Sequence, residues 1–404
     1  MSDSKKNAPK RRFEEFSNAN DWEQRKLGEV VDFLNGKAYK QQELLEFGKF
    51  RVLRVGNFNT NDRWYYSDLE LDENKYANKG DLLYLWATNF GPEIWNEESV
   101  IYHYHIWKLQ FLSNELDKQY LYTWLLTDKE KIKQTTNGTT MVHVTKGSIE
   151  QREFQYPTNK KEQQKIGMFF KQLDNTIALH QRKLEKIKAL KTAYLSEMFP
   201  AEGESKPKRR FAGFTDAWEQ RKVLEIAKET YGGGTPKTSV PEYWQGKIPW
   251  IQSSDLIIDS LFNVIPKKHI TEVAIKNSAA KYIPSNSIAI VTRVGVGKIV
   301  FMPFEYATSQ DFLSLSNLQV DYNFGVYSIY TMLRRELNNI QGTSIKGITK
   351  SDLLEKNLIK PTSMNEQQKI GTFFKQLDDT IALHQRKLQK LQNIKKAYLN
   401  EMFI

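Results

Sequence analysis

Side chains that can read DNA bases occur in short polar clusters beside aromatic residues. Arg, Lys, Asn, Gln, Ser and Thr are the residues that hydrogen-bond base edges in the major groove, from turns and helix starts. Any one of these positions is explained better as a solvated loop residue, so the hypothesis depends on the clusters. In the first half of the chain the candidates are Lys37, Tyr39, Lys40, Arg54, Asn57, Arg63, Trp86, Thr88 and Asn89. In the second half they are Thr235, Lys237, Thr238, Ser239, Ser253, Ser254, Arg293, Lys298, Ser309 and Gln310.

The motifs of common active sites are missing from the sequence. The glycine turn ending at Lys298 continues with Ile299 and lacks the upstream glycine of a phosphate-binding loop. An adenine methyltransferase would need an Asn/Asp-Pro-Pro-aromatic motif and a Gly-rich loop, and neither occurs. His103 and His105 would share a strand face, but with no cysteine and no third ligand in view an aromatic-rich structural strand is the better interpretation. We predict no catalytic residue and no metal site.

The charge of the chain is unevenly distributed. The formal net charge of +11 is typical of a protein with a polyanionic partner such as nucleic acid. Residues 13–158 are nevertheless net acidic, with a charge of −6. A DNA-binding face on this part of the chain must therefore be a local patch.

The sequence contains a long internal repeat. Residues 162–199 recur as 366–403, with 29 of 38 positions identical. Upstream, residues 9–13 (PKRRF) recur as 207–211, and residues 22–26 (WEQRK) recur as 218–222. The intervening stretches, roughly 30–135 and 225–340, look unrelated to each other. Two variable domains within one shared frame are expected to pack about a pseudo-two-fold axis.

The repeated segments are predicted to be long helices. Hydrophobic residues recur in steps of four and three from Ile166 to Ile187, which is a coiled-coil seam, and again from Ile370 to Leu391. A helix of this length, about 57 Å, is unstable alone, so its sister copy is the expected partner. An antiparallel pair would hold the two domains apart at a set distance. A purely structural coiled coil is the alternative.

The fold class is predicted to be α+β, with two mixed α/β recognition domains separated by two long antiparallel coiled-coil helices. Because the opening residues repeat the end of the central linker, we expect a cyclic arrangement with the N-terminal tail near the C-terminus. The expected segments are a basic tail (1–12), a first domain (13–158), a helix (159–199), a linker (200–210), a second domain (211–362) and a helix (363–404). Short strands are expected over residues 51–55, 81–86, 99–109, 287–292 and 299–301, and short helices over 120–126 and 326–333.

The setting predicted for the chain is cytoplasmic. No stretch reaches the roughly 18 uninterrupted apolar residues of a membrane span, because Arg293 and Lys298 break the best candidate. The first residues show no secretory signal, and the absence of cysteine is compatible with a reducing compartment.

The chain resembles the specificity subunits of type I restriction-modification systems. The resemblance rests on the doubled EQQKIG opening of the helices at Glu162 and Glu366 and on the Gly-Thr-Thr/Ser turn and Thr-Lys pair before each. It also rests on residues 233–238 (GGTPKT), followed by 241–244 (PEYW) and 248–251 (IPWI). From this turn Thr139, Thr140, Thr343 and Ser344 join the DNA-binding candidates.

The resemblance implies a non-catalytic subunit that reads a split site in double-stranded DNA, one half per domain. It implies two methyltransferase subunits, which use S-adenosylmethionine to methylate adenine at N6, and two restriction subunits, which use ATP and Mg²⁺. No cofactor is expected on this chain and no membrane is involved. The shared segments would dock the methyltransferase subunits, which assigns Phe169, Phe170, Phe373 and Phe374 to that contact, although core packing explains them equally well.

Two alternatives of other classes remain. A self-sufficient DNA methyltransferase or nuclease would need the active-site motifs that are missing. A coiled-coil scaffold that does not bind DNA would give no reason for two divergent domains within one frame.

Overall fold

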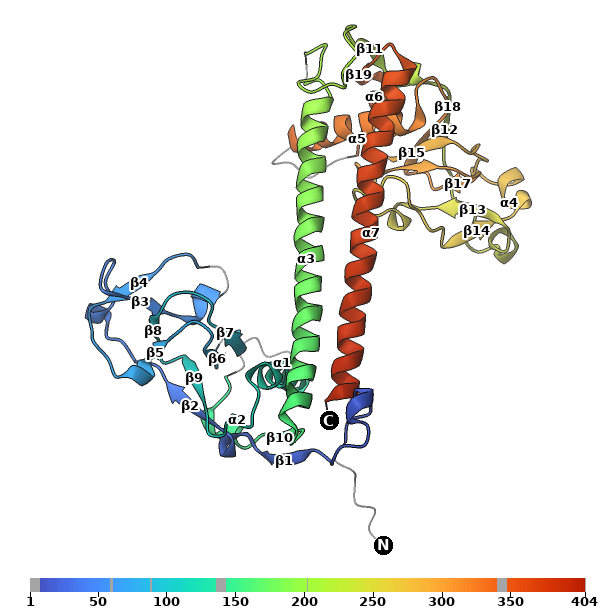
Figure 1. Ribbon diagram of the computed structural model, residues 1–404. Helices are drawn as coiled ribbons and strands as arrows, with labels where there is room; N and C mark the ends of the chain where they lie inside the picture. Colours follow the sequence, from blue (N-terminus) through green and yellow to red (C-terminus); the bar gives the residue numbers. More distant parts are fainter. Residues whose placement is uncertain are drawn as a thin grey trace. The chain divides into compact units, whose positions relative to one another are not determined.

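The computed structural model describes residues 8–58, 61–87, 89–135, 143–201, 203–339 and 347–403. The chain divides into two compact units. The first unit contains Met1–Gln181 and Arg386–Ile404, and the second contains Arg182–Gln385. Each unit therefore combines one globular domain with a segment of each long helix (Figure 1).

The two long helices are α3 (Lys160–Met198) and α7 (Met364–Met402), which confirms the helices predicted from the repeat. In the first unit the start of α3 packs on the end of α7, with the rings of Phe169 and Tyr398 5.1 Å apart. In the second unit the end of α3 packs on the start of α7, with Tyr194 and Phe373 5.2 Å apart. The pairing is antiparallel in both units, as predicted.

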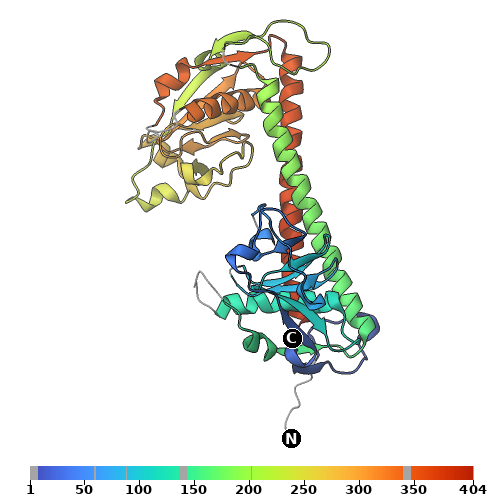
Figure 2. The same ribbon diagram turned by 90° about the vertical axis from the view of Figure 1, so that its left-hand side faces the viewer.

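The first domain contains two four-stranded sheets beside α1 (Lys118–Thr135) (Figure 2). One sheet has the order β2 (Val31–Asn35), β9 (Ile106–Phe111), β6 (Leu82–Leu85), β7 (Gly91–Ile94). The other has the order β4 (Tyr65–Ser67), β3 (Phe50–Leu53), β8 (Val100–Tyr102), β5 (Tyr76–Ala77). A ribbon of β1 (Glu23–Lys26) and β10 (Glu153–Tyr156), with the short helix α2 (Lys146–Glu150), adjoins the start of α3.

The second domain is built in the same way beside α5 (Tyr322–Asn339). Its larger sheet has the order β12 (Ala227–Gly232), β18 (Phe312–Leu318), β15 (Ser287–Val291), β16 (Ile299–Met302). A three-stranded sheet has the order β14 (Lys268–Ile270), β13 (Ile248–Ile251), β17 (Ala307–Thr308), with α4 (Glu272–Lys276) close by. The ribbon is formed by β11 (Glu219–Lys222) and β19 (Asn357–Lys360), with α6 (Lys350–Glu355) before β19.

The interpretation that the two variable stretches are unrelated is wrong at the level of the fold. The sheet β2–β9–β6–β7 has the same order and antiparallel pairing as β12–β18–β15–β16. The parallel pair β3 and β8 likewise corresponds to β13 and β17. Strand order is set by long-range pairing between segments, and many different sequences can form the same pairing, so the repeat extends through sequences that share no motif.

The helices expected over 120–126 and 326–333 are also longer than predicted, at 18 residues each in α1 and α5. The apolar pattern marks only the part of each helix that packs into the core. The remaining turns are polar and partly exposed, as at Glu130 and Lys133 in α1.

The cyclic arrangement predicted from the linker is confirmed. At the end of α3 the chain continues covalently, and the backbone N–H of Arg209 donates to the carbonyl of Glu197 at 2.9 Å. At the end of α7 the N-terminal segment takes the same place, and the N–H of Arg11 donates to the carbonyl of Glu401 at 2.9 Å. The side chains of Arg11 and Arg209 form ion pairs with the same two glutamates.

Candidate nucleic-acid interface

The EQQKIG motif attaches each domain to its helix. Glu162 and Glu366 are almost fully buried. Both oxygens of each carboxylate accept hydrogen bonds from the guanidinium group of one arginine. Arg12 reaches Glu162 at 2.6 and 2.7 Å, and Arg210 reaches Glu366 at 2.6 and 2.8 Å. Such bidentate charge-assisted bonds compensate the burial of the carboxylate. The repeated PKRRF segment thus supplies the partner of the repeated glutamate.

The glutamine and glycine of the motif have equally specific roles. Gln163 accepts the backbone N–H of Asp117 at 2.8 Å and donates to the carbonyl of Pro157 at 2.8 Å. Gln367 makes the same pair of bonds with Asp321 and Pro361. A Cβ at Gly167 would lie 2.8 Å from the backbone nitrogen of Tyr120, so only glycine lets α1 approach α3 this closely.

The four phenylalanines assigned to partner docking differ in burial. Phe170 and Phe374 are fully buried in the core of their units. Phe169 and Phe373 are only partly buried. Each ring lies between the phenylalanine of a PKRRF segment and a tyrosine of the other long helix. Any surface offered to a partner by these pairs therefore belongs to Phe169 and Phe373.

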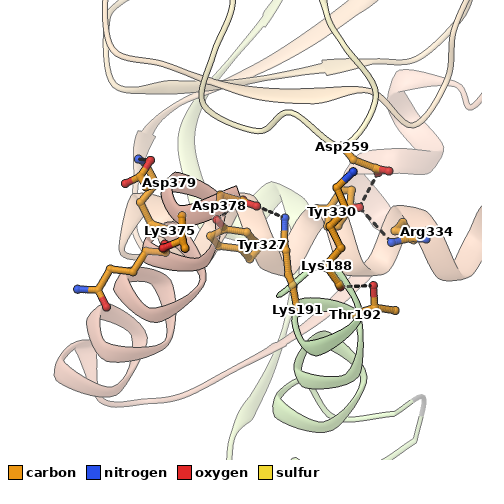
Figure 3. A network of polar contacts seen from close by, with 12 residues as sticks. Lys188, Lys191, Thr192, Asp259, Tyr327, Tyr330, Arg334, Lys375, Asp378 and Asp379 are labelled. Atoms are coloured by element: carbon orange, nitrogen blue, oxygen red, sulfur yellow. Dashed lines mark hydrogen bonds and ion pairs between the residues drawn. The ribbon is translucent and has the colours of Figure 1, made fainter. Parts of the chain in front are cut away.

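The second unit has an additional buried polar network (Figure 3). The ammonium group of Lys191 on α3 donates to Asp378 on α7 at 2.5 Å, and Tyr327 on α5 donates to the other oxygen of Asp378 at 2.5 Å. Burial, and then the charge of Asp378, raises the pKa of Tyr327. The network joins three helices. In the corresponding pair of the first unit, Lys395 and Asp174, both side chains are more exposed, and Thr123 stands in place of Tyr327.

In the first domain, three candidate loops meet beside one turn, residues 103–105 between β8 and β9. His103 donates its backbone N–H to Leu53, at the start of the loop after β3. Lys37 in the loop after β2 donates to Tyr102, and Trp86 in the loop after β6 donates to His105. These backbone bonds bring together side chains from separate parts of the sequence.

The same bonds occur in the second domain at the turn 309–311, between β17 and β18. Ser309 donates its N–H to Ile251, Gly234 donates to Thr308, and Thr292 donates to Asp311. Residue by residue, the turn His103–Tyr104–His105 corresponds to Ser309–Gln310–Asp311. Tyr104 and Gln310 are both exposed at its tip. The two faces thus share a backbone and differ in chemistry.

The first face is aromatic and cationic. The guanidinium groups of Arg54 and Arg63 lie 4.1 and 5.2 Å from the ring centroid of Tyr65. Tyr39 stacks on His103 at 6.2 Å, and Asn57 accepts the backbone N–H of Arg54 at 3.0 Å. These residues include four of the first-domain candidates, and the contacts hold their side chains in place.

Three histidines line the same face. Trp86 lies 4.8 Å from His105 and 6.1 Å from His143, ring centroid to ring centroid. Burial, and then the neighbouring His105, lowers the pKa of His103 to about 4. Burial also lowers the pKa of His105. Near neutral pH the rings of His103 and His105 are therefore uncharged, and they can accept as well as donate hydrogen bonds.

The second face is polar and carries a preformed loop. Lys298 donates to the carbonyl of Ser253 at 2.9 Å, which ties the loop after β15 to the loop after β13. Gly295 and Gly297 have positive φ angles of 88° and 92°, so this turn needs glycine at both positions. Thr235 donates to the side-chain oxygen of Gln310 at 2.7 Å. Arg293 and Ser254 are exposed beside these contacts.

Some candidates lie away from these clusters. Lys40 is exposed at the start of a 3-10 helix, Asn89 is exposed between β6 and β7, and Lys237, Thr238 and Ser239 form an exposed turn before the segment 241–244. Thr88, Thr139, Thr140, Thr343 and Ser344 lie outside the described residues.

The sequence interpretation missed several residues of the two faces. Lys350, which follows the repeated Thr349, lies beside the second face, because a Cβ at Gly232 would stand 2.8 Å from its ammonium nitrogen. The repeated Thr-Lys pair was a signal for it. His103 and His105 were assigned only to a structural strand, and His143 was not considered.

The described residues contain neither a candidate metal cluster nor a candidate membrane-spanning helix. Within these residues no group of three or more His, Cys, Asp or Glu side chains is arranged to hold a metal ion. None of the helices in the described part of the chain has the length and apolar character that a membrane span requires.

The fold is that of solved specificity subunits. It matches the crystal structure of the type I restriction-modification S subunit from M. genitalium with a TM-score of 0.66 at 15% identity, over 98% of this chain and 99% of that one. A second match, from a study of complex assembly and conformational transition of the type I R-M system, has a TM-score of 0.51 at 15% identity, covering 95% and 97%.

Residues 19–189 and 215–393 match the model of the type I restriction modification DNA specificity domain, so the chain belongs to this family and contains its domain twice. It is 29% identical over 191 residues to the MjaIX specificity subunit of Methanocaldococcus jannaschii, covering 46% of this chain and 44% of that protein. It is 32% identical over 177 residues to the EcoR124I/EcoR124II specificity subunit of Escherichia coli, covering 40% and 41%. These two alignments thus span less than half of each relative. The MjaVIII specificity subunit of M. jannaschii is 23% identical over 94% of this chain and 91% of its own length.

Proposed function

We propose that this chain is the DNA-recognition subunit of a type I restriction-modification complex. Each domain reads one half of a bipartite duplex target, and the antiparallel helices set the spacer between the halves. The observation that carries the proposal is the pair of equivalent loop faces, in which the same backbone bonds present dissimilar side chains. A divided reading function needs one scaffold and two different contact surfaces.

The experiment is an exchange of one variable domain. Residues 30–135 are replaced by the corresponding segment of another family member, and the methylome of a host carrying the chain and its partner subunits is sequenced. One half of the methylated sequence should change and the other should stay. The matched control exchanges residues 225–340, which should change the opposite half. If both halves or neither changed, the assignment of one half-site to each domain would be wrong.

The proposal gives the chemistry to other subunits. Two methyltransferase subunits use S-adenosylmethionine to methylate adenine at N6, and two restriction subunits use ATP and Mg²⁺ to translocate and cleave DNA. The purified chain with S-adenosylmethionine and duplex DNA should therefore transfer no methyl group. Transfer by the chain alone would support the self-sufficient methyltransferase instead.

The partner subunits dock on the long helices and the repeated segments beside them. Seam residues such as Leu173 and Ile177 remain only partly buried, so apolar surface is left along the helices. The partners also supply much of the phosphate contact, in keeping with the acidic balance of residues 13–158. The isolated chain should bind DNA weakly, and the complex tightly and in a salt-sensitive manner. Equally tight binding by the chain alone would contradict this division of contacts.

A further inference from the structure

The repeated lysines Lys146 and Lys350 have opposite electrostatic surroundings. Both follow a threonine that caps a short helix: Thr145 accepts from the N–H of Ser148, and Thr349 accepts from the N–H of Asp352. The local backbone is therefore the same at both positions. The difference between the two side chains comes from Glu150, which follows Lys146 on the same helix and is replaced by Leu354 in the second copy, and from residues of the variable stretches.

Lys146 is neutralised within the first domain. Its ammonium group lies 3.2 Å from a carboxylate oxygen of Asp32 and 3.6 Å from one of Glu150. It also donates to the carbonyl of Phe33 at 2.9 Å. With two acids and a carbonyl around it, this lysine is a structural link between α2 and β2.

Lys350 is surrounded by cations. Its ammonium group lies against Gly232, at the end of β12, and it makes no ion pair within the described residues. Burial, and next the charge of Arg293, lowers the pKa of Lys350, and Lys281 acts in the same direction. Among the described residues, the acid that opposes them is Asp311, which accepts a hydrogen bond from Ser309 at 3.2 Å.

The backbone contacts explain why these cations gather. A Cβ at Gly347 would lie 2.6 Å from the carbonyl of Thr292 and 3.2 Å from the Cα of Arg293, so the chain entering α6 runs against the loop after β15. A Cβ at Gly234, just after β12, would lie 2.3 Å from the carbonyl oxygen of Ala279, so the segment leading to Lys281 also runs against the end of this strand. Arg293 and Lys281 are exposed, and Lys350 is partly buried. Three cations with a single nearby acid repel one another, and an anion placed between them would relieve that repulsion.

We infer that Lys350, Arg293 and Lys281 form a seat, that is, a binding site, for a DNA backbone phosphate in the second domain. The first domain has no equivalent site, because Asp32 and Glu150 form ion pairs with its lysine, Lys146. The seat fixes the register of the second face on the duplex while the neighbouring loop tips reach the base edges. This inference rests on the proposed function. It adds that the phosphate contact of the two domains is unequal.

The test compares K350Q with the matched control K146Q in the full-length chain assembled with methyltransferase subunits. Binding to a duplex carrying the target found by methylome sequencing, and to an unrelated duplex, is measured over a range of salt concentrations. Each phosphate contact contributes about 0.9 to the slope of log K against log salt. K350Q should make the slope less steep by about that amount on both duplexes. K350R should keep the slope, and K146Q should leave it unchanged.

Three results would overturn the seat. The first is an unchanged slope in K350Q, and the second is an equal loss of slope in K146Q. The third is a change in the base preference of the second half-site in K350Q at constant slope, which would make Lys350 a base reader. Thermal unfolding of each variant verifies folding, and R293Q provides a second variant that should also lower the slope. A wild-type complex that bound both duplexes equally would refute sequence recognition itself, whereas the slopes on the unrelated duplex would still decide the seat.

Discussion

Tyr104 and Gln310 occupy the same position in the two faces, at the exposed tip of the central turn. A phenol ring and a carboxamide offer different contacts: the ring stacks and makes apolar contact, whereas the amide bonds two groups of an adenine edge. At the residue scale this pair is the clearest case of divergent chemistry on a common backbone.

Replacing Tyr104 by alanine in the assembled complex should therefore weaken discrimination in one half-site by about 10- to 100-fold and leave the other half intact, since a good base contact contributes about 1–3 kcal/mol. Competition binding with duplexes mutated in each half measures this. Q310A is the matched variant and should affect the opposite half. Equal losses in both halves for either variant would contradict the prediction.

The lowered pKa of His103 predicts a dependence of stability on pH. Its pKa is about 4 in the folded chain and about 6.5 in an unfolded one, so the unfolded state binds the proton more readily between these values. Stability should be fully present above pH 6.5 and decrease as the pH falls toward 4. Thermal unfolding of the chain at several pH values measures this, and H103Q should weaken the dependence. An identical dependence in H103Q would assign it to other groups.

At the scale of elements, the repeated frame explains how two different domains attach to similar helices. In each copy the arginine of the PKRRF segment bonds the buried glutamate. The glutamine and the glycine of the EQQKIG motif make equivalent contacts with the start of α1 or α5. The motif is conserved between the copies because it has a packing role. These contacts are made by residues outside the loops of the two faces, so the loops are free to differ.

Buried and exposed ion pairs at equivalent helix positions should differ in their contribution to stability. In the second unit the Lys191 side chain is 9% exposed, whereas Lys395 in the first unit is 22% exposed. D378A leaves a buried ammonium group unpaired and should cost about 3 kcal/mol. D174A should cost less than about 1 kcal/mol. Denaturant unfolding of both variants measures the difference, and similar costs would show that the Tyr327 network adds nothing.

At the scale of the whole molecule, the chain is a closed cycle of two repeats. The N-terminal segment binds the end of α7 with the bonds that the linker makes at the end of α3. Each unit is completed by helix residues from the opposite half of the sequence. Neither half of the sequence therefore contains a complete unit on its own.

Insertion of one heptad into each helix, in register with the seam, should lengthen the spacer of the DNA target. Seven residues add about 10 Å to a helix and keep the apolar stripe aligned. Methylome sequencing should show the same two half-sites with more base pairs between them. An unchanged spacer would refute the proposal that the helices set it. Insertion into only one helix shifts the seam and serves as the mismatched control.

The sequence alone determined the duplication, the two antiparallel helices, the cyclic closure and the fold class, because identity at a fixed offset and a 3.5-residue apolar period are properties of the chain itself. Only the tertiary structure decided that residues 30–135 and 225–340 share one topology, since strand order depends on long-range pairing that no local pattern encodes. It also decided which polar residues belong together: Lys146 and Lys350 both follow a capping threonine, and the packing of distant segments places Asp32 beside the first and Arg293 near the second.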